Sequence, residues 1–191
     1  MTPGIRVATG SDAGAVCAIY SPIVKETAIS FEYEPPSAGE MRRRIGEALE
    51  RFPFLVIERD GEVAGYAYAG PHRRREAYRW AVEVSVFVRR DHRRRGAGRA
   101  LYGALLQLLR LQGFVQAFAV ITIPNPASIA FHETLGFRRI GTCKNVGFKL
   151  GFWRDTGWWH LLLRKPPEKP LPPEPFPAVR DRPQAKTALG A

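Results

Sequence analysis

A short glycine-containing segment, Arg93-Arg94-Arg95-Gly96-Ala97-Gly98, constrains the fold of this chain more than any other feature. It follows a β-rich run at 84–88 and precedes a helical pattern that begins at Arg99. Glycine has no Cβ, so backbone N–H groups in such a loop can close on an anion, and the first N–H groups of a helix lack internal partners. The sequence therefore predicts a strand–loop–helix unit that binds a phosphate.

Two common phosphate-binding loops do not match this segment. A P-loop needs a lysine and a serine or threonine directly after its last glycine, whereas Arg99 and Ala100 follow Gly98. A dinucleotide-binding loop needs a third glycine at the position that Leu101 occupies. The remaining pattern, R-x-x-G-x-G, predicts an anion site of another kind, although a solvated arginine-rich turn would show the same residues.

The length and composition suit one globular domain followed by a tail. The chain has 191 residues, of which 45% are hydrophobic, and it contains no apolar run near the length of about 18 residues that a membrane helix needs. Cys17 and Cys143 are the only cysteines, too few for a disulfide framework or a zinc site. We therefore expect a cytoplasmic protein without a metal.

The net charge of +11 is high and is compatible with nucleic acid, an anionic membrane or small anionic ligands as partners. Arginines cluster at 42–44, 73–75 and 89–99. A nucleic-acid-binding face would interleave such clusters with exposed aromatic residues. We therefore expect a small anionic ligand rather than nucleic acid or a membrane, and a basic nucleic-acid-binding module is kept as the alternative outside enzymes.

Hydrophobic periodicity and turn signals divide the chain into eleven expected elements. Strands are expected at 5–8, 54–58, 63–69, 78–88, 117–123, 137–143 and 158–163, and helices at 12–27, 37–51, 99–112 and 125–135. The order β-α-α-β-β-β-α-β-α-β-β predicts a single α/β domain at 1–165, with a mixed central sheet and helices on both faces. Residues 166–191 hold eight of the 16 prolines, so we expect an extended or disordered tail.

Two ordered motifs in this chain resemble those of a known superfamily. The run 84–88, with R-x-x-G-x-G and the leucine-rich helix after it, resembles the acetyl-CoA motif of the GNAT N-acetyltransferases, and 125–137 resembles their second cofactor motif. Four shorter segments, 67–71, 77–80, 147–149 and 153–159, are similar to the phosphinothricin N-acetyltransferase family, over about residues 5 to 164. The resemblance implies a GNAT-like fold, acetyl-CoA as co-substrate and a homodimer.

The resemblance also implies two catalytic residues. Glu83 lies in an apolar strand, where burial of a carboxylate is costly unless it is paired. Spacing alone would equally allow a glutamate that faces outward. The position matches the general base of the family. His132 stands where most GNAT enzymes have a tyrosine that protonates the departing thiolate. It is expected to act as acid, as second base or as a packed helix residue.

The same resemblance places the coenzyme along the strand, the glycine loop and the following helix starts. The backbone at 86–88 would meet the oxyanion of the reaction if this strand parts from its neighbour, and Asn125 would bind the pantetheine or simply cap a helix. The expected cofactor-binding residues are Val86, Phe87, Val88, Arg93, Arg94, Arg95, Gly96, Ala97, Gly98, Arg99, Asn125 and Ser128.

A smaller group of residues is expected to bind the acceptor amine. Arg73 and Arg75 fall where the family has basic residues that face an anionic substrate, although a solvated loop would look the same; Phe31 and Tyr78 complete the expected set. The implied reaction is direct acetyl transfer in a ternary complex to a small amino-acid-like amine, such as phosphinothricin, methionine sulfoximine or methionine sulfone. The alternative is a GNAT enzyme that acetylates a protein N-terminus or lysine.

Overall fold

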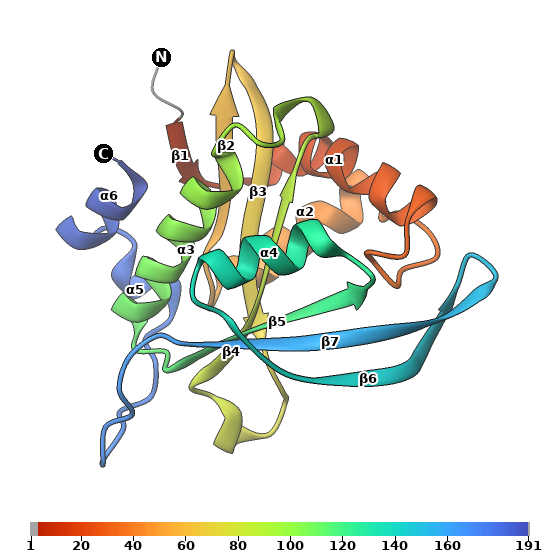
Figure 1. Ribbon diagram of the computed structural model, residues 1–191. Coiled ribbons are helices and arrows are strands. Elements are labelled where there is room, and N and C mark those ends of the chain that lie inside the picture. Colours follow the sequence, from red (N-terminus) through yellow and green to blue (C-terminus); the bar gives the residue numbers. More distant parts are fainter. Residues whose placement is uncertain (1–3, 191) are drawn as a thin grey trace.

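In the computed structural model, which describes residues 4–190, one seven-stranded sheet runs through the molecule (Figure 1). Its order is β1-β2-β3-β4-β5-β7-β6, and neighbouring strands pair antiparallel except for β4 and β5, which are parallel. The strands are β1 Gly4–Val7, β2 Phe54–Arg59, β3 Glu62–Pro71, β4 Ala81–Val88, β5 Gln116–Ile123, β6 Arg138–Lys149 and β7 Phe152–Leu162. The predicted mixed sheet is confirmed.

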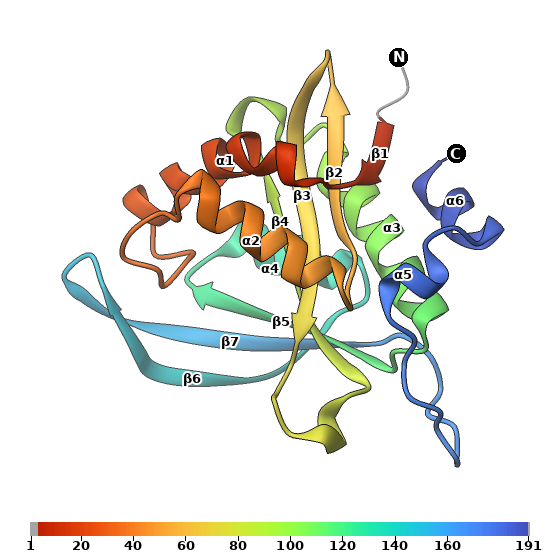
Figure 2. The same ribbon diagram turned by 180° about the vertical axis from the view of Figure 1, so that it is seen from behind.

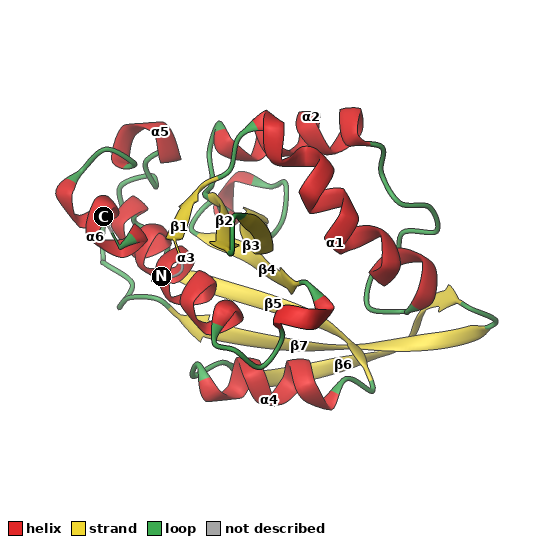
Figure 3. Ribbon diagram, turned by 90° about the horizontal axis from the view of Figure 1, so that it is seen from above, coloured by secondary structure: helices red, strands yellow, loops and turns green. Residues whose placement is uncertain are grey.

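Helices cover both faces of this sheet, as predicted (Figure 3). Helices α1 and α2 cross one face, which Figure 2 shows from behind, and α3 and α4 cover the other. Ser37 caps α2 by accepting a hydrogen bond from the Glu40 amide, and Asn125 caps α4 in the same way with Ser128. The helices are α1 Ala13–Glu26, α2 Ala38–Leu49, α3 Ala97–Gln112, α4 Pro126–Thr134, α5 Phe176–Val179 and α6 Pro183–Leu189.

Side chains of β4 alternate between the two faces and so enter two different cores. Val82 and Val84 are buried in the core that includes α3. Phe87 packs instead with Tyr20 of α1, with 5.2 Å between ring centroids. Glu83 has the same parity as Phe87, so its side chain lies on the face that α1 and α2 cover.

Strands β4 and β5 part after three residue pairs. Their pairing extends from Ala81–Gln116 to Glu83–Phe118. Beyond this point β4 continues to pair with β3 on one side, and β5 continues to pair with β7. The two strands diverge in Figure 1, which leaves a gap that opens from Glu83 toward the glycine loop. This is the separation that the resemblance implied.

Strands β6 and β7 form a longer hairpin than predicted. The sequence indicated strands at 137–143 and 158–163, whereas the hairpin continues to a turn at Leu150 and Gly151, which have φ of 53° and 77°. Most of β6 is exposed. An exposed strand carries no alternation of polar and apolar residues, so periodicity could not reveal its distal half.

The prediction for the tail was wrong for its second part, whereas residues 166–175 form no helix or strand. Instead of being extended or disordered, residues 176–189 form the two short helices α5 and α6, which pack beside α3 (Figure 2). Phe176, Val179 and Ala185 are buried in the same core as α3. These three apolar side chains are separated by prolines and charged residues, too few and too irregular to form a helical period. The tail is therefore part of the domain that was expected to end at residue 165.

Candidate active site

A cavity of about 210 Å³ lies in the gap between β4 and β5. It reaches both faces of the sheet, because Tyr20 and Tyr68 line it from the α1 side and Tyr102 of α3 lines it from the other. Four of the residues predicted to bind coenzyme line it as well: Val86, Phe87, Asn125 and Ser128. A molecule on one face can therefore meet a molecule on the other through this gap.

The glycine loop begins α3 at one end of the gap. Gly96 is the N-cap, with a φ of 82° that favours glycine, and Arg94 also has a positive φ of 59°. The first helical hydrogen bond runs from the Ala100 amide to the Gly96 carbonyl at 3.0 Å. The amides at 97–99 precede it and have no place in the helical hydrogen-bond ladder. The helix starts at Ala97, two residues before the predicted start.

Uncompensated positive charge surrounds these amides. The arginine ion pairs of this region are those of Arg89 with Glu62 and Asp91. Arg94, Arg95 and Arg99 form none within residues 4–190. Free amides at a helix start and unpaired guanidinium groups suit a diphosphate. The geometry of the loop therefore suits a diphosphate.

Two contacts fix the shape of the loop. The Arg93 Nε donates to the Val88 carbonyl at 3.2 Å, and an Arg59 guanidinium N–H donates to the Arg95 carbonyl at 2.6 Å. Both join the loop to strands of the sheet. A Cβ on Gly98 would lie 3.4 Å from the Phe131 ring of α4, so the second glycine also allows α3 and α4 to approach closely.

His132 is buried and lines the gap cavity from α4. Its Nδ1 lies 2.8 Å from the Ser128 carbonyl oxygen, which can only accept, so Nδ1 carries the proton of the neutral ring. Its Nε2 lies 3.0 Å from the Tyr102 hydroxyl and accepts from it. Burial lowers the pKa of His132, and burial raises the pKa of Tyr102, so both groups are uncharged at neutral pH.

Glu83 lies where the gap begins, directly before Val84 in the cavity wall. Its Oε1 lies 3.1 Å from Nδ1 of His72 and 3.3 Å from an Arg73 guanidinium nitrogen. Its Oε2 has no hydrogen-bond partner among the described residues. The carboxylate is thus paired through one oxygen, and its side chain is 36% exposed. The other oxygen is free to accept a proton.

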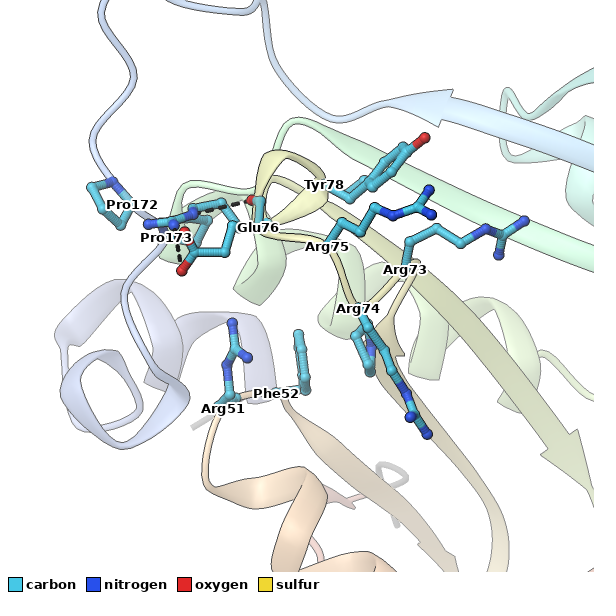
Figure 4. A pocket seen from close by; sticks show the side chains of 12 residues that line it. Arg51, Phe52, Arg73, Arg74, Arg75, Glu76, Tyr78, Pro172 and Pro173 are labelled. Carbon is cyan, nitrogen blue, oxygen red and sulfur yellow. Dashed lines mark hydrogen bonds and ion pairs between the residues drawn. The ribbon is translucent and has the colours of Figure 1, made fainter.

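None of the four predicted substrate residues lines the gap cavity. Arg73, Arg75 and Tyr78 line a neighbouring hollow of about 450 Å³, in which Arg73 and Arg75 extend away from Arg51 (Figure 4). Arg73 also lies over the Trp158 ring, 5.0 Å from its centroid, and so joins this hollow to the Glu83 carboxylate. Phe31 lies elsewhere, on the distal part of the β6–β7 hairpin.

Phe31 belongs to a loop that the hairpin holds in place. A Cβ on Gly147 would lie 2.4 Å from the Phe31 ring, so only glycine allows this contact. The buried Lys149 ammonium donates to three backbone carbonyls of this region, those of Val24, Ser30 and Glu32, at 2.6–2.7 Å. Burial lowers the pKa of Lys149. The carbonyl contacts compensate part of the cost of burying this charge.

Sequence analysis missed three residues of this region: His72, Tyr102 and Lys149. Tyr102 falls in the apolar stripe of α3, where an aromatic residue indicates only core packing. Lys149 belongs to a segment that resembles the family, but its partners lie more than 110 residues away in sequence. His72 lies in a charged loop. No local pattern could have revealed these contacts.

Comparison with known proteins identifies the class. A family model for the acetyltransferase (GNAT) domain matches residues 5–158, so the chain belongs to the GNAT acetyltransferases. It is 41% identical to the phosphinothricin N-acetyltransferase of Streptomyces viridochromogenes, over 92% of this chain and 93% of that one. The chain is thus a member of the phosphinothricin N-acetyltransferase-like family and an acetyl-CoA-dependent N-acetyltransferase.

A second relative and a solved structure agree with this assignment. The chain is 36% identical to the L-methionine sulfoximine/L-methionine sulfone acetyltransferase of Pseudomonas aeruginosa, over 85% of this chain and 96% of the relative. The crystal structure of a GNAT superfamily phosphinothricin acetyltransferase from Sinorhizobium meliloti, in complex with acetyl-CoA, superposes with a TM-score of 0.84. Its identity is 36%, with 92% of this chain and 99% of that chain covered.

Residues 4–190 contain no group of three or more histidine, cysteine, aspartate or glutamate side chains arranged to hold a metal ion. None of the helices within this range is both long and apolar enough to cross a membrane.

Proposed function

We propose that this enzyme acetylates the amino group of a small amino-acid-like substrate, of the kind represented by phosphinothricin, methionine sulfoximine and methionine sulfone. The observation that carries the proposal is the gap between β4 and β5. The Glu83 carboxylate lies at the start of this gap, on one face of the sheet, and the glycine loop lies at the other end of the gap. This arrangement supports direct transfer in a ternary complex, because an amine and a thioester can meet in the gap without an enzyme-bound acetyl group.

Glu83 is the proposed general base. An aliphatic amine is mostly protonated at neutral pH and attacks only after it loses a proton. Acetyl-CoA supplies the acetyl group as a thioester. The free Oε2 of Glu83 takes the proton of the amine, directly or through one water. In the antiparallel pairing of β4 with β3, alternate N–H groups at 84–88 point away from β3 and toward the gap, where they can stabilise a developing oxyanion.

His132 is assigned a hydrogen-bonding role rather than that of a proton donor. An acid at this place would need a proton on Nε2, but Nε2 accepts from Tyr102, and burial lowers the pKa of the imidazole. The neutral ring holds the Tyr102 hydroxyl at the wall of the cavity. Tyr102 is then the group with an exchangeable proton that faces the gap on the α3 side.

An oxygen-rich acceptor suits the groups around Glu83. The indole Nε1 of Trp158 is buried and has no partner among the described residues. An unmet buried donor costs about 1–3 kcal/mol, and a substrate oxygen would satisfy it. Arg73 lies over the same ring, and Arg75 extends beside Arg73 (Figure 4). These donors support a substrate with a carboxylate and a second oxygen-bearing group, as in phosphinothricin.

We also propose a homodimer and a cytoplasmic location. Phe148, Phe152 and Trp153 are 48–65% exposed on the distal β6–β7 hairpin, and β6 is an edge strand of the sheet. Exposed apolar patches and free strand edges favour contact with another chain. Two cysteines that are not joined support this location, because disulfides are rare in a reducing compartment. Light scattering of the purified protein, at several concentrations, would test the dimer.

An amine panel tests the proposed substrate class. Acetyl-CoA is mixed with phosphinothricin, methionine sulfoximine, methionine sulfone, the common amino acids and an N-terminal peptide, and release of free thiol is followed. We expect kcat/KM to be largest for one of the amino-acid analogues. A largest value for the peptide would favour the alternative of a protein acetyltransferase, and no turnover with any small amine would refute the proposal.

A further inference from the structure

The Glu83 carboxylate is held by a histidine that belongs to a different element. His72 lies in the loop after β3, and its Nδ1 is 3.1 Å from Oε1 of Glu83. We propose that His72 is the positioning residue of the catalytic base: its Nδ1–H donor fixes the Glu83 carboxylate through Oε1 and leaves Oε2 free for the amine. This inference rests on the proposed role of Glu83 as general base.

The His72 ring is fixed on three sides by aromatic side chains. It stacks on Phe118 of β5, with 4.2 Å between centroids and 15° between planes. Trp158 and Tyr78 meet it edge-on, at 5.9 and 5.8 Å. The His72 side chain is only 10% exposed, compared with 36% for Glu83. The ring therefore has one orientation before any substrate binds.

The fixed ring orients the carboxylate. A glutamate side chain has three rotatable bonds, and one hydrogen bond to an immobile donor removes most of that freedom. Only Oε1 is engaged by His72 and Arg73, while Oε2 has no partner within residues 4–190. The arrangement separates the two oxygens into one that is held and one that is available. Such preorganisation lowers the barrier for proton transfer from a bound amine.

His72 is the closer and less exposed of the two side chains that reach this oxygen. Because the carboxylate accepts, the proton of the contact lies on Nδ1 of His72, at 3.1 Å. The guanidinium of Arg73 is 49% exposed and lies at the longer distance of 3.3 Å, so solvent screens its charge. The fixed imidazole, rather than the exposed guanidinium, therefore sets the direction of the carboxylate.

Two substitutions separate this role from simple packing. His72→Asn retains an N–H donor near the position of Nδ1, whereas His72→Leu has a similar volume and no donor. We expect His72→Leu to lower kcat about tenfold or more, with the KM for acetyl-CoA unchanged, and His72→Asn to recover most of the loss. Equal losses of kcat in the two variants, or wild-type kcat in His72→Leu, would overturn the proposal.

A double variant tests whether His72 acts through Glu83. If it does, adding His72→Leu to Glu83→Gln lowers kcat by less than threefold beyond the single Glu83→Gln variant, because the group that it positions is already lost. A full additional tenfold loss would show an independent role and overturn the inference. Wild-type turnover by Glu83→Gln would show that Glu83 is not the base, and the proposed role of His72 would be lost with it. A loss of turnover in Glu83→Gln but not in His72→Leu would leave the proposed function intact and overturn the role of His72 alone.

Discussion

The Tyr102 hydroxyl and the His132 imidazole form a hydrogen bond of 3.0 Å across two helices at the wall of the sheet gap. Tyr102 comes from α3, which the glycine loop begins, and His132 comes from α4, which Asn125 caps. The bond therefore joins the two segments that were expected to bind the coenzyme. A second hydrogen bond, from Nδ1 of His132 to the Ser128 carbonyl at 2.8 Å, fixes the ring tautomer.

Burial of neutral His132 makes stability depend on pH. Its pKa is lowered in the folded protein, so below the ordinary histidine value of about 6.5 the unfolded chain binds a proton that the folded chain does not. Stability contributed by this group is therefore lost as the pH falls through that value. We expect Tm to fall more steeply between pH 7 and pH 5 for wild type than for His132→Gln. Parallel curves in differential scanning calorimetry would contradict the burial of a neutral ring.

Glu83→Gln should lower kcat about 100-fold or more, because the amide cannot take the proton of the amine. The side chain keeps its size, and the glycine loop that would hold the coenzyme lies at the other end of the gap, so the KM for acetyl-CoA should stay within about twofold. Steady-state kinetics with the best amine of the panel measures both. A shift in the acetyl-CoA KM with little loss of kcat would place Glu83 in binding rather than in proton transfer.

Loss of Lys149 should release the loop that carries Phe31. Lys149→Met leaves three carbonyls without their donor, at a cost of at least about 2 kcal/mol. Amide hydrogen exchange at 27–32 should become faster, and the KM for the amine should rise more than that for acetyl-CoA. Lys144→Met is the matched control, because Lys144 is exposed on the same strand. Equal exchange in the two variants would show that the ammonium does not hold the loop.

Gly147→Ala should displace Phe31 from its place on the hairpin. A new Cβ would lie 2.4 Å from the Phe31 ring, so the ring has to move, and such overpacking costs about 1–3 kcal/mol. Gly141→Ala, on the same strand with nothing within 4 Å of its Cβ, serves as control. A crystal structure and the KM for the amine would report the change. If both variants bind the amine like wild type, the position of Phe31 is unimportant to the acceptor.

Local signals predicted the parts of the fold that local chemistry determines. The Asp60–Gly61 turn, the Ser37 and Asn125 caps and the glycine loop each have a residue type that the backbone requires, and each lies where it was expected. The separation of β4 from β5 came from the resemblance and not from periodicity. A buried apolar strand has the same residue pattern whether or not its neighbour is hydrogen-bonded to it, because the sequence specifies side chains and not the pairing of backbones.

Contacts between distant segments could not be predicted. His132 was expected in the site, but its partner Tyr102 looked like any core aromatic residue. Arg73 was expected to face the substrate, and the structure adds that it reaches Glu83 and the Trp158 ring. Lys149 is buried where its ammonium meets carbonyls from the end of α1 and from the loop that follows this helix. Such roles arise from packing, which a single sequence does not record.

Part of the tail is buried, although its composition predicted an extended or disordered segment. Phe176 is 1% exposed in the core that includes α3, and its amide donates to the Arg51 carbonyl at 3.2 Å. Removing a buried aromatic side chain leaves a cavity and costs about 3–5 kcal/mol. We therefore expect Phe176→Ala to lower Tm by about 10 °C in a chain of this size.

An exposed residue of the same tail provides the comparison for this variant. Leu171 is 84% exposed, so Leu171→Ala should leave Tm within about 1 °C of wild type. The side chain of Gln112, at the end of α3, donates to the carbonyls of both Arg51 and Glu174, so loosening the tail also removes partners from the loop before β2. Thermal unfolding of both variants tests whether the tail belongs to the folded core. Equal Tm values would mean that the tail is not part of this core in solution.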